Sequence, residues 1–147
     1  MAGHREFMDR AFAEAKRSFD EGGIPIGAVL VRNSHVIGAG HNLRIQRSDP
    51  VAHGEMDCIR NAGRQRSYRD TALYTTLSPC MMCAGTIVQF AIPRVVIGEN
   101  RSFGGNEAFL KTRGVEVVVL DDLRCYELMR EFIRLHRDIW MEDIGKS

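Results

Sequence analysis

The chain has 147 residues, 44% of them hydrophobic and 27% charged, which is typical of one globular domain over residues 1–147. Twenty basic residues against nineteen acidic ones give a formal charge of +1, which argues against a strongly basic nucleic-acid-binding module. No apolar run approaches the roughly 20 residues that cross a bilayer, and no secretory signal is visible at the N-terminus. We therefore expect a cytoplasmic protein with no membrane span and no nucleic-acid partner.

Hydrophobic periodicity in the first part of the chain predicts a helix, a hairpin and a second helix. Apolar residues recur at helical spacing over residues 5–20, and Gly22-Gly23 follow as a C-terminal stop. Two apolar runs separated by Asn33-Ser34 predict a hairpin, because these residues favour turns. The elements expected here are the helix 5–20, strands over 26–31 and 36–39, a loop around 48–50 and a helix over 55–62.

Strands and helices alternate in the remainder. Ser78-Pro79 predict a helix start, since serine can cap a helix and proline favours its first position. The elements expected here are a strand over 72–76, a helix from 78 to about 90, a strand over 94–97, a short helix over 107–111, a strand over 115–120, and one long final helix striped by Leu128, Phe132, Leu135 and Ile139. This order indicates an α/β domain with a mixed sheet and helices on both faces.

The four cysteines divide into a close pair and two isolated residues. Cys80 and Cys83 form a C-x-x-C motif, whereas Cys58 and Cys125 stand alone. A chain of this length can fold without disulfides. Because no secretory signal is visible, there is no reason to expect an oxidising compartment. We therefore assign the close pair to a metal site and the two isolated cysteines to the core.

His53, Cys80 and Cys83 form the candidate zinc site. Two thiolates and one imidazole suit Zn²⁺, and three protein ligands leave a fourth tetrahedral position open for water. Glu55 follows His53 by two residues, so it can carry a proton beside the metal without binding it. The pattern H-x-E followed by P-C-x-x-C is the signature of the zinc-dependent deaminases.

Three other interpretations of the motif remain. The C-x-x-C pair could be redox-active, but a redox motif requires neither the upstream His-x-Glu nor the preceding proline. A structural zinc site would need a fourth ligand, for which Cys58 or Cys125 is available. A non-catalytic, zinc-stabilised interaction module is the third, and Glu55 beside an open coordination position argues against it.

Beyond the motif, the chain resembles the small zinc-dependent cytosine deaminases of the yeast type, in the cytidine-deaminase-like superfamily. The resemblance spans nearly the whole chain, and its blocks are Glu21–Gly27, Gly40–Asn42, Leu73–Cys80, Ile92–Arg94, Val96–Asn100, Thr112–Gly114, Trp140 and Glu142–Gly145. It implies a three-layer α/β/α sandwich with a central five-stranded mixed sheet, one catalytic Zn²⁺ per subunit, and a homodimer.

The resemblance also implies a role for each site residue. His53, Cys80 and Cys83 match the zinc ligands, and Glu55 matches the proton shuttle. The residues that match substrate contacts are Asn42 through its amide, Gly54 through its backbone N–H, Ser78 through its backbone carbonyl, Asp143 through its carboxylate, and Phe103, Trp140 and Ile26 as pocket walls. The implied reaction is the hydrolytic deamination of free cytosine to uracil and ammonia.

Two departures from the family bear on the substrate. Met81 follows the first cysteine where the yeast-type enzymes carry an acidic residue, and the Phe103–Phe109 segment is about one residue shorter. Guanine, isocytosine, creatinine or a triazine are therefore alternative substrates. A tRNA adenosine deaminase shares the motif, but the near-neutral charge disfavours it because phosphate contacts need Lys and Arg. Glu142–Gly145 match a lid that leaves no room for ribose, which favours a free base.

Overall fold

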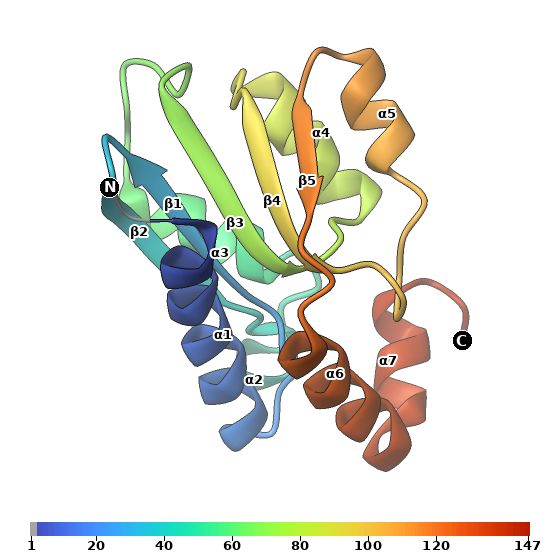
Figure 1. Ribbon diagram of the computed structural model, residues 1–147. Helices are drawn as coiled ribbons and strands as arrows, with labels where there is room; N and C mark the ends of the chain where they lie inside the picture. Colours follow the sequence, from blue (N-terminus) through green and yellow to red (C-terminus); the bar gives the residue numbers. More distant parts are fainter. Residues whose placement is uncertain (1–2) are drawn as a thin grey trace.

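The computed structural model describes residues 3–147, in which helices cover both faces of a five-stranded sheet (Figure 1). The helices are α1 (His4–Asp20), α2 (Arg44–Arg47), α3 (Gly54–Ala62), α4 (Met81–Gln89), α5 (Glu107–Thr112), α6 (Leu123–Leu135) and α7 (Arg137–Asp143). The strands are β1 (Gly27–Arg32), β2 (His35–His41), β3 (Thr71–Leu77), β4 (Arg94–Glu99) and β5 (Glu116–Val119). Within residues 3–147 no helix is long and apolar enough to cross a membrane.

The sheet is mixed, with the strand order β2-β1-β3-β4-β5. Strand β1 pairs antiparallel with both β2 and β3, whereas β3, β4 and β5 are parallel. The hairpin turns at Asn33 and Ser34, whose φ angles of 49° and 63° place both in the left-handed region typical of a tight hairpin turn. The expected hairpin and the parallel strands that follow it are thus confirmed.

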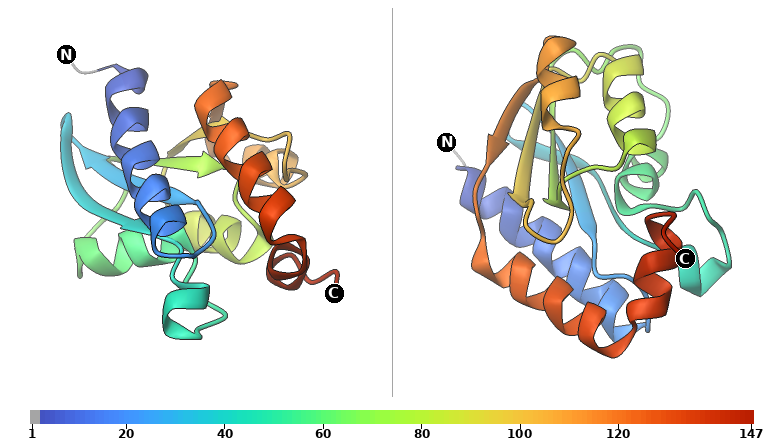
Figure 2. Two further views of the ribbon diagram at one scale, coloured as in Figure 1. Left: turned by 90° about the horizontal axis from the view of Figure 1, so that it is seen from below. Right: turned by 90° about the vertical axis from the view of Figure 1, so that its right-hand side faces the viewer.

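Alternation along the strands divides the core into two layers. In β1, Ala28 and Leu30 face a cluster formed with α3, α4 and α5, whereas Val29 and Val31 face a cluster with α1 and α6. Successive side chains of a strand point to opposite faces, so one strand supplies both layers. Figures 1 and 2 show α1 and α6 on one face of the sheet and α3 and α4 on the other.

The C-terminal region corrects the prediction of one long final helix. Helix α6 ends at Leu135, and α7 begins after His136, whose φ and ψ of −140° and 54° are not helical. The chain turns back between the two helices (Figures 1 and 2). This turn leaves Leu135 49% exposed and buries Trp140 in a third apolar cluster, so the burial of one large aromatic side chain competes with continuation of the helix.

One expectation about a helix start also needs correction, and one short helix was not expected. Ser78 does not begin α4, because the helix starts at Met81 and Cys80 occupies the N-cap, accepting a hydrogen bond from the Cys83 N–H at 3.5 Å. The Ser78 hydroxyl instead contacts the Glu107 carboxylate. The loop expected around residues 48–50 is preceded by the one-turn helix α2, which is too short to give a periodic pattern.

Candidate metal centre and active site

Two helix starts place the three expected metal ligands side by side. His53 is the N-cap residue of α3, and Cys80 is the N-cap residue of α4, with Cys83 in its first turn. His53 Nδ1 lies 3.4 Å from Cys80 Sγ and 3.9 Å from Cys83 Sγ. The three ligand atoms all lie within 4.8 Å of one another.

The donor set fits zinc. One imidazole nitrogen and two sulfurs are the ligands that Zn²⁺ prefers, and their closeness lets one ion reach all three. A hydrogen bond from Cys83, assisted by one from His53, outweighs burial and lowers the pKa of Cys80 to about 4. Cys80 is therefore poised as a thiolate, the form that binds metal. Three protein ligands leave room for one more, which is the arrangement of catalytic zinc sites.

The two other cysteines lie in the core. Cys58 is fully buried in the layer with α3 and α4, and Cys125 is buried in the layer with α1. Burial raises the pKa of Cys58 well above its usual range and that of Cys125 to about 12. Both thiols therefore stay protonated, and neither belongs to the His53–Cys80–Cys83 group. A fourth cysteine ligand, as a structural zinc site would use, is not supplied by either residue.

Glu55 is held beside the cluster in the first turn of α3 and is only 4% exposed. Burial raises its pKa to about 7, and the neighbouring Cys80 charge acts in the same direction. A bound divalent cation would oppose this shift, because positive charge favours the carboxylate. A carboxyl group with a pKa near neutrality can both accept and return a proton, as a general acid–base requires.

Asp143, at the end of α7, closes the other side of the cluster. One of its carboxylate oxygens, Oδ1, lies 3.3 Å from His53 Nε2, the ring nitrogen that faces away from the sulfurs. A carboxylate at this nitrogen holds a metal-binding imidazole in orientation. The same oxygen lies 3.8 Å from Arg44 Nη1, and Arg44 also pairs with Glu142 at 3.0 Å. We call α7 together with Ile144 the lid.

A pocket of about 560 Å³ opens above the cluster and is bounded by the lid. Of the expected site residues, eight line it: Ile26, His53, Glu55, Ser78, Cys80, Phe103, Trp140 and Asp143. Phe103 and Trp140 meet edge to face with ring centroids 6.4 Å apart, so the β4–α5 segment packs against the lid. The other three expected residues, Asn42, Gly54 and Cys83, are buried and do not contribute to the lining.

Two polar atoms at the expected substrate contacts have no hydrogen-bond partner within residues 3–147. They are Asn42 Nδ2, a donor, and Asp143 Oδ1, an acceptor whose 3.3 Å approach to His53 Nε2 is an ion-pair contact and not an aligned hydrogen bond. Buried polar atoms are nearly always paired, so both mark places where a ligand or water completes the site. Gly54 is constrained sterically as well, because a Cβ there would lie 2.8 Å from the Ile26 carbonyl oxygen.

Sequence reasoning missed several residues that line the pocket. Arg44 is the most consequential, because its ion pairs join α2 to the lid 98 positions later in the chain. Asn106 also lines the pocket and donates to the Pro79 carbonyl at 3.0 Å. Arg44 lies two residues after Asn42, and that proximity is the only signal the sequence offered. The exposed Met81, one of the two family departures, lines the pocket too, as do Gly104 and Gly105 from the other.

Comparisons with known proteins agree with this geometry. The family model of the cytidine and deoxycytidylate deaminase zinc-binding region matches residues 1–99. A cytosine deaminase from Candida albicans is 49% identical over 139 residues, which span 92% of this chain and 93% of that protein. A tRNA-specific adenosine deaminase from Streptococcus pyogenes is 40% identical over 106 residues, spanning 69% of this chain and 67% of that protein.

The fold is shared with solved structures. One from work on A-to-I editing by tRNA:A34 deaminases superposes with a TM-score of 0.75 at 30% identity, covering 84% of this chain and 99% of that one. The expected cytidine-deaminase-like α/β fold is thereby confirmed, as is the expected zinc cofactor. The family model and the near full-length relative together show that this chain belongs to the cytidine and deoxycytidylate deaminase zinc-binding family.

Proposed function

We propose that this protein is a zinc-dependent aminohydrolase that converts free cytosine and water to uracil and ammonia. The observation that carries the proposal is geometric: the buried carboxyl of Glu55 is set beside three metal ligands in a pocket under a lid. The 49% identity with a cytosine deaminase over nearly the full chain supports cytosine as the substrate.

The ligands His53, Cys80 and Cys83 would hold the zinc ion. When bound, zinc supplies the Lewis acidity that makes water a nucleophile near neutral pH. Glu55 accepts the proton that water loses on attacking C4 and delivers it to ring N3. It then takes the remaining proton from the new C4 hydroxyl to the amino group, so that the C4–N bond breaks, the C4 carbonyl forms, and the products are uracil and ammonia. In this proposal one carboxyl reaches the attacking water, ring N3 and the departing amine, so a single residue serves as both general base and general acid.

In this proposal the two unpartnered polar atoms orient the base, Asp143 Oδ1 from the pocket lining and Asn42 Nδ2 from its buried position outside the lining. Asn42 Nδ2 can donate to the carbonyl oxygen of a pyrimidine, and Asp143 Oδ1 can accept from its amino group. The Gly54 N–H and the Ser78 carbonyl complete the polar contacts in this proposal. Ile26, Phe103 and Trp140 form apolar walls that exclude water.

A free base suits the lid better than a nucleoside in RNA. The Arg44–Glu142 ion pair and the Phe103–Trp140 contact tie the lid to two other segments, where a polynucleotide strand would have to pass. The formal charge of +1 offers little excess Lys and Arg for phosphates. The similarity to tRNA adenosine deaminases keeps tRNA as the second candidate substrate, and salt-sensitive tRNA binding with inosine formation would favour it.

We further infer that residues 1–147 act as one domain, in the cytoplasm, on a small molecule, and as a homodimer. The homodimer rests on the family resemblance, and sedimentation of the zinc-loaded protein tests it. A mass near twice 16.6 kDa supports a dimer, whereas a single-chain mass contradicts it.

The decisive experiment is ammonia release by the purified zinc enzyme across a panel of amines. The panel contains cytosine, 5-methylcytosine, isocytosine, guanine, creatinine, a triazine, cytidine and adenosine. We expect the highest kcat/KM with cytosine and negligible turnover of cytidine, because in this proposal the lid closes over a free base. Preferential release from guanine or another member of the panel would replace cytosine as the substrate while leaving the reaction type intact. No release from any amine would contradict an aminohydrolase.

A further inference from the structure

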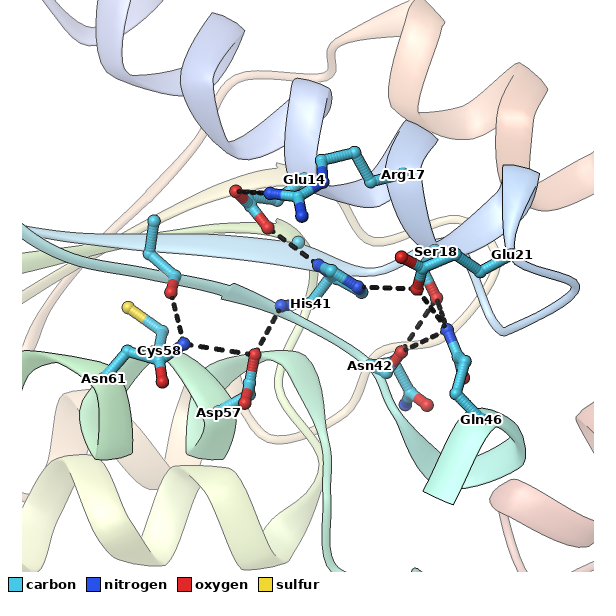
Figure 3. A network of polar contacts seen from close by, with 12 residues as sticks. Glu14, Arg17, Ser18, Glu21, His41, Asn42, Gln46, Asp57, Cys58 and Asn61 are labelled. Atoms are coloured by element: carbon cyan, nitrogen blue, oxygen red, sulfur yellow. Dashed lines mark hydrogen bonds and ion pairs between the residues drawn. The ribbon is translucent and has the colours of Figure 1, made fainter. Parts of the chain in front are cut away.

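Behind Asn42 lies a partly buried polar network that the proposed reaction does not use (Figure 3). The Asn42 backbone carbonyl accepts two hydrogen bonds from side chains, from Ser18 Oγ at 2.8 Å and from Gln46 Nε2 at 3.1 Å. Ser18 belongs to α1 and Gln46 to α2, and both Ser18 and Asn42 are fully buried. One carbonyl therefore joins two helices at the point where β2 ends.

Gln46 is the centre of this network. Its amide nitrogen, which carries two protons, has three acceptors within hydrogen-bond distance: Ser18 Oγ at 3.0 Å, Glu21 Oε1 at 3.1 Å and the Asn42 carbonyl at 3.1 Å. The amide also fills the space over Gly23, where a Cβ would lie 2.3 Å from its nitrogen. Glycine at position 23 thus leaves room for the amide, and one side chain joins two segments of the chain, residues 18–23 and Asn42.

His41, the residue before Asn42, is fixed from two sides. Its Nδ1 lies 2.7 Å from a Glu14 carboxylate oxygen, and its Nε2 lies 2.9 Å from Glu21 Oε1. Its backbone N–H donates to Asp57 of α3 at 3.1 Å. The hydrogen bond with Glu14, joined by that with Glu21, raises the pKa of His41 despite its burial. Arg17 pairs with Glu14 on the outer side of this cluster.

The network engages the backbone and leaves the Asn42 carboxamide free on one side. Asn42 Oδ1 accepts from the Arg44 N–H at 2.9 Å, and Asn42 Nδ2 is buried with no hydrogen-bond partner within residues 3–147. In Figure 3 the Asn42 carboxamide points away from Ser18. Backbone contacts therefore set the direction of the one donor that remains for a ligand.

We propose that Ser18, Gln46 and His41 are positioning residues that hold the Asn42 donor toward the base, so that α1 governs substrate affinity without lining the pocket. The inference rests on the proposed function for the identity of the base. Removing such support weakens ground-state and transition-state binding alike, because the contact with the base exists in both. Loss of uniform binding raises KM and leaves kcat nearly unchanged.

The kinetic test uses Ser18→Ala and Gln46→Met in the zinc-loaded protein. We expect each to raise KM for cytosine by about 3- to 10-fold, the effect of one buried hydrogen bond, with kcat changed by less than about 2-fold. Matched controls are Thr71→Val and Gln65→Met, which remove hydrogen bonds to the Tyr68 and Ala62 carbonyls away from the pocket. Unchanged KM in both variants, or equal changes in the controls, would overturn the proposal.

Gln46→Glu adds a pH signature that a packing role would not give. The carboxylate has no proton to donate to the Asn42 carbonyl, whereas the protonated acid has one. We expect the KM ratio of variant to wild type to fall as the pH is lowered from 8 to 5. A ratio that does not change with pH counts against the network.

A spectroscopic arm separates this inference from the proposed function. In protein labelled with ¹⁵N-asparagine, the Asn42 amide signals, assigned by their absence in Asn42→Ala, should shift in Ser18→Ala and Gln46→Met and stay fixed in the two controls. This measurement needs no turnover. If the wild-type enzyme fails to deaminate cytosine, the proposed function is refuted, but the Asn42 signals still test the network. If the Asn42 signals do not shift in Ser18→Ala and Gln46→Met, the network is refuted.

Discussion

The two sides of the pocket are built in different ways. The metal side consists of His53, Glu55, Cys80 and Cys83, which lie at the starts of two helices and within four residues of one another in each segment. The lid side comes from α2, the β4–α5 segment and α7, held by the Arg44 ion pairs and the Phe103–Trp140 contact. Short-range backbone geometry fixes the first side, and long-range packing fixes the second. We therefore expect changes on the metal side to lower kcat and changes on the lid side to raise KM.

The largest effect is expected on the metal side, from Glu55→Gln. The amide keeps the size of the side chain but cannot carry the proton, so kcat should fall by at least about 10²-fold while zinc remains bound. Steady-state kinetics and metal analysis of the same preparation measure both quantities. Glu127→Gln, an exposed position on α6, is the control. Turnover retained in the zinc-loaded variant would remove Glu55 from the reaction.

On the lid side, Trp140→Leu should have the next largest effect. Trp140 is 4% exposed and packs among Ile24, Ile26, Leu77, Met129 and Phe132. The smaller side chain leaves a cavity, and we expect the free energy of unfolding to fall by about 2 kcal/mol. KM should rise about 10-fold because the lid loses its anchor. Urea denaturation and kinetics test this, and a fall in kcat without a change in KM would break the contrast between the two sides.

A smaller effect is expected from Arg44→Met, which removes both ion pairs to the lid. The Glu142 side chain is half exposed, so water screens the pair and the expected rise in KM is only about 3- to 5-fold. Glu142→Gln and the double variant complete a mutant cycle that isolates the interaction. Additive effects in the cycle would mean that Arg44 acts through Asp143 instead of Glu142.

The smallest effect concerns stability and pH. The folded-state pKa of His41 is raised, so the stability that its charge contributes is fully present below the unfolded value near 6.5 and is lost as the pH rises through the folded pKa. The pKa values of Glu14 and Glu21 are lowered, so their contribution is lost as the pH falls through the acidic range. At pH 6 the free energy of unfolding of the zinc-saturated wild type should exceed that of the His41→Gln variant by on the order of 1 kcal/mol.

This difference should shrink between pH 6.5 and 9, as followed by urea denaturation of both proteins. His35→Gln, an exposed position at the other end of β2, is the control and should show no such trend. If the stability difference between wild type and His41→Gln grew with pH, the pH dependence would have the opposite sign and would contradict a charged His41.

The contrast between the two sides also explains how far the sequence could be interpreted. The metal side was predictable because its ligands occur in two short motifs whose spacing fixes their geometry on a helix start. Even there the details differed, since Cys80 and not Ser78 caps α4. Both residues can accept from a backbone N–H, but the Ser78 hydroxyl contacts Glu107 and the Cys80 sulfur accepts from the Cys83 N–H.

The lid side was accessible only through family resemblance. The local pattern of residues 128–139 does not predict the helix break at His136, because Leu135 and Ile139 continue the helical spacing. The break becomes favourable when Trp140 finds a buried site between the β4–α5 segment and α6. Arg44 likewise acquires its role from a partner 98 positions away, which no local pattern encodes.

The sequence by itself therefore predicted the α/β class, the mixed sheet, the His53–Cys80–Cys83 group and the placement of Glu55 beside it, because periodicity and motif spacing are local properties of the chain. Tertiary structure alone decided which helix caps form, where the last helix breaks, how Arg44 ties the lid down and how Ser18 and Gln46 hold Asn42. Those features depend on burial and on hydrogen bonds between segments that meet only after the sheet has assembled. Their free energies come from contacts, and contacts between distant residues leave no periodic trace in a single sequence.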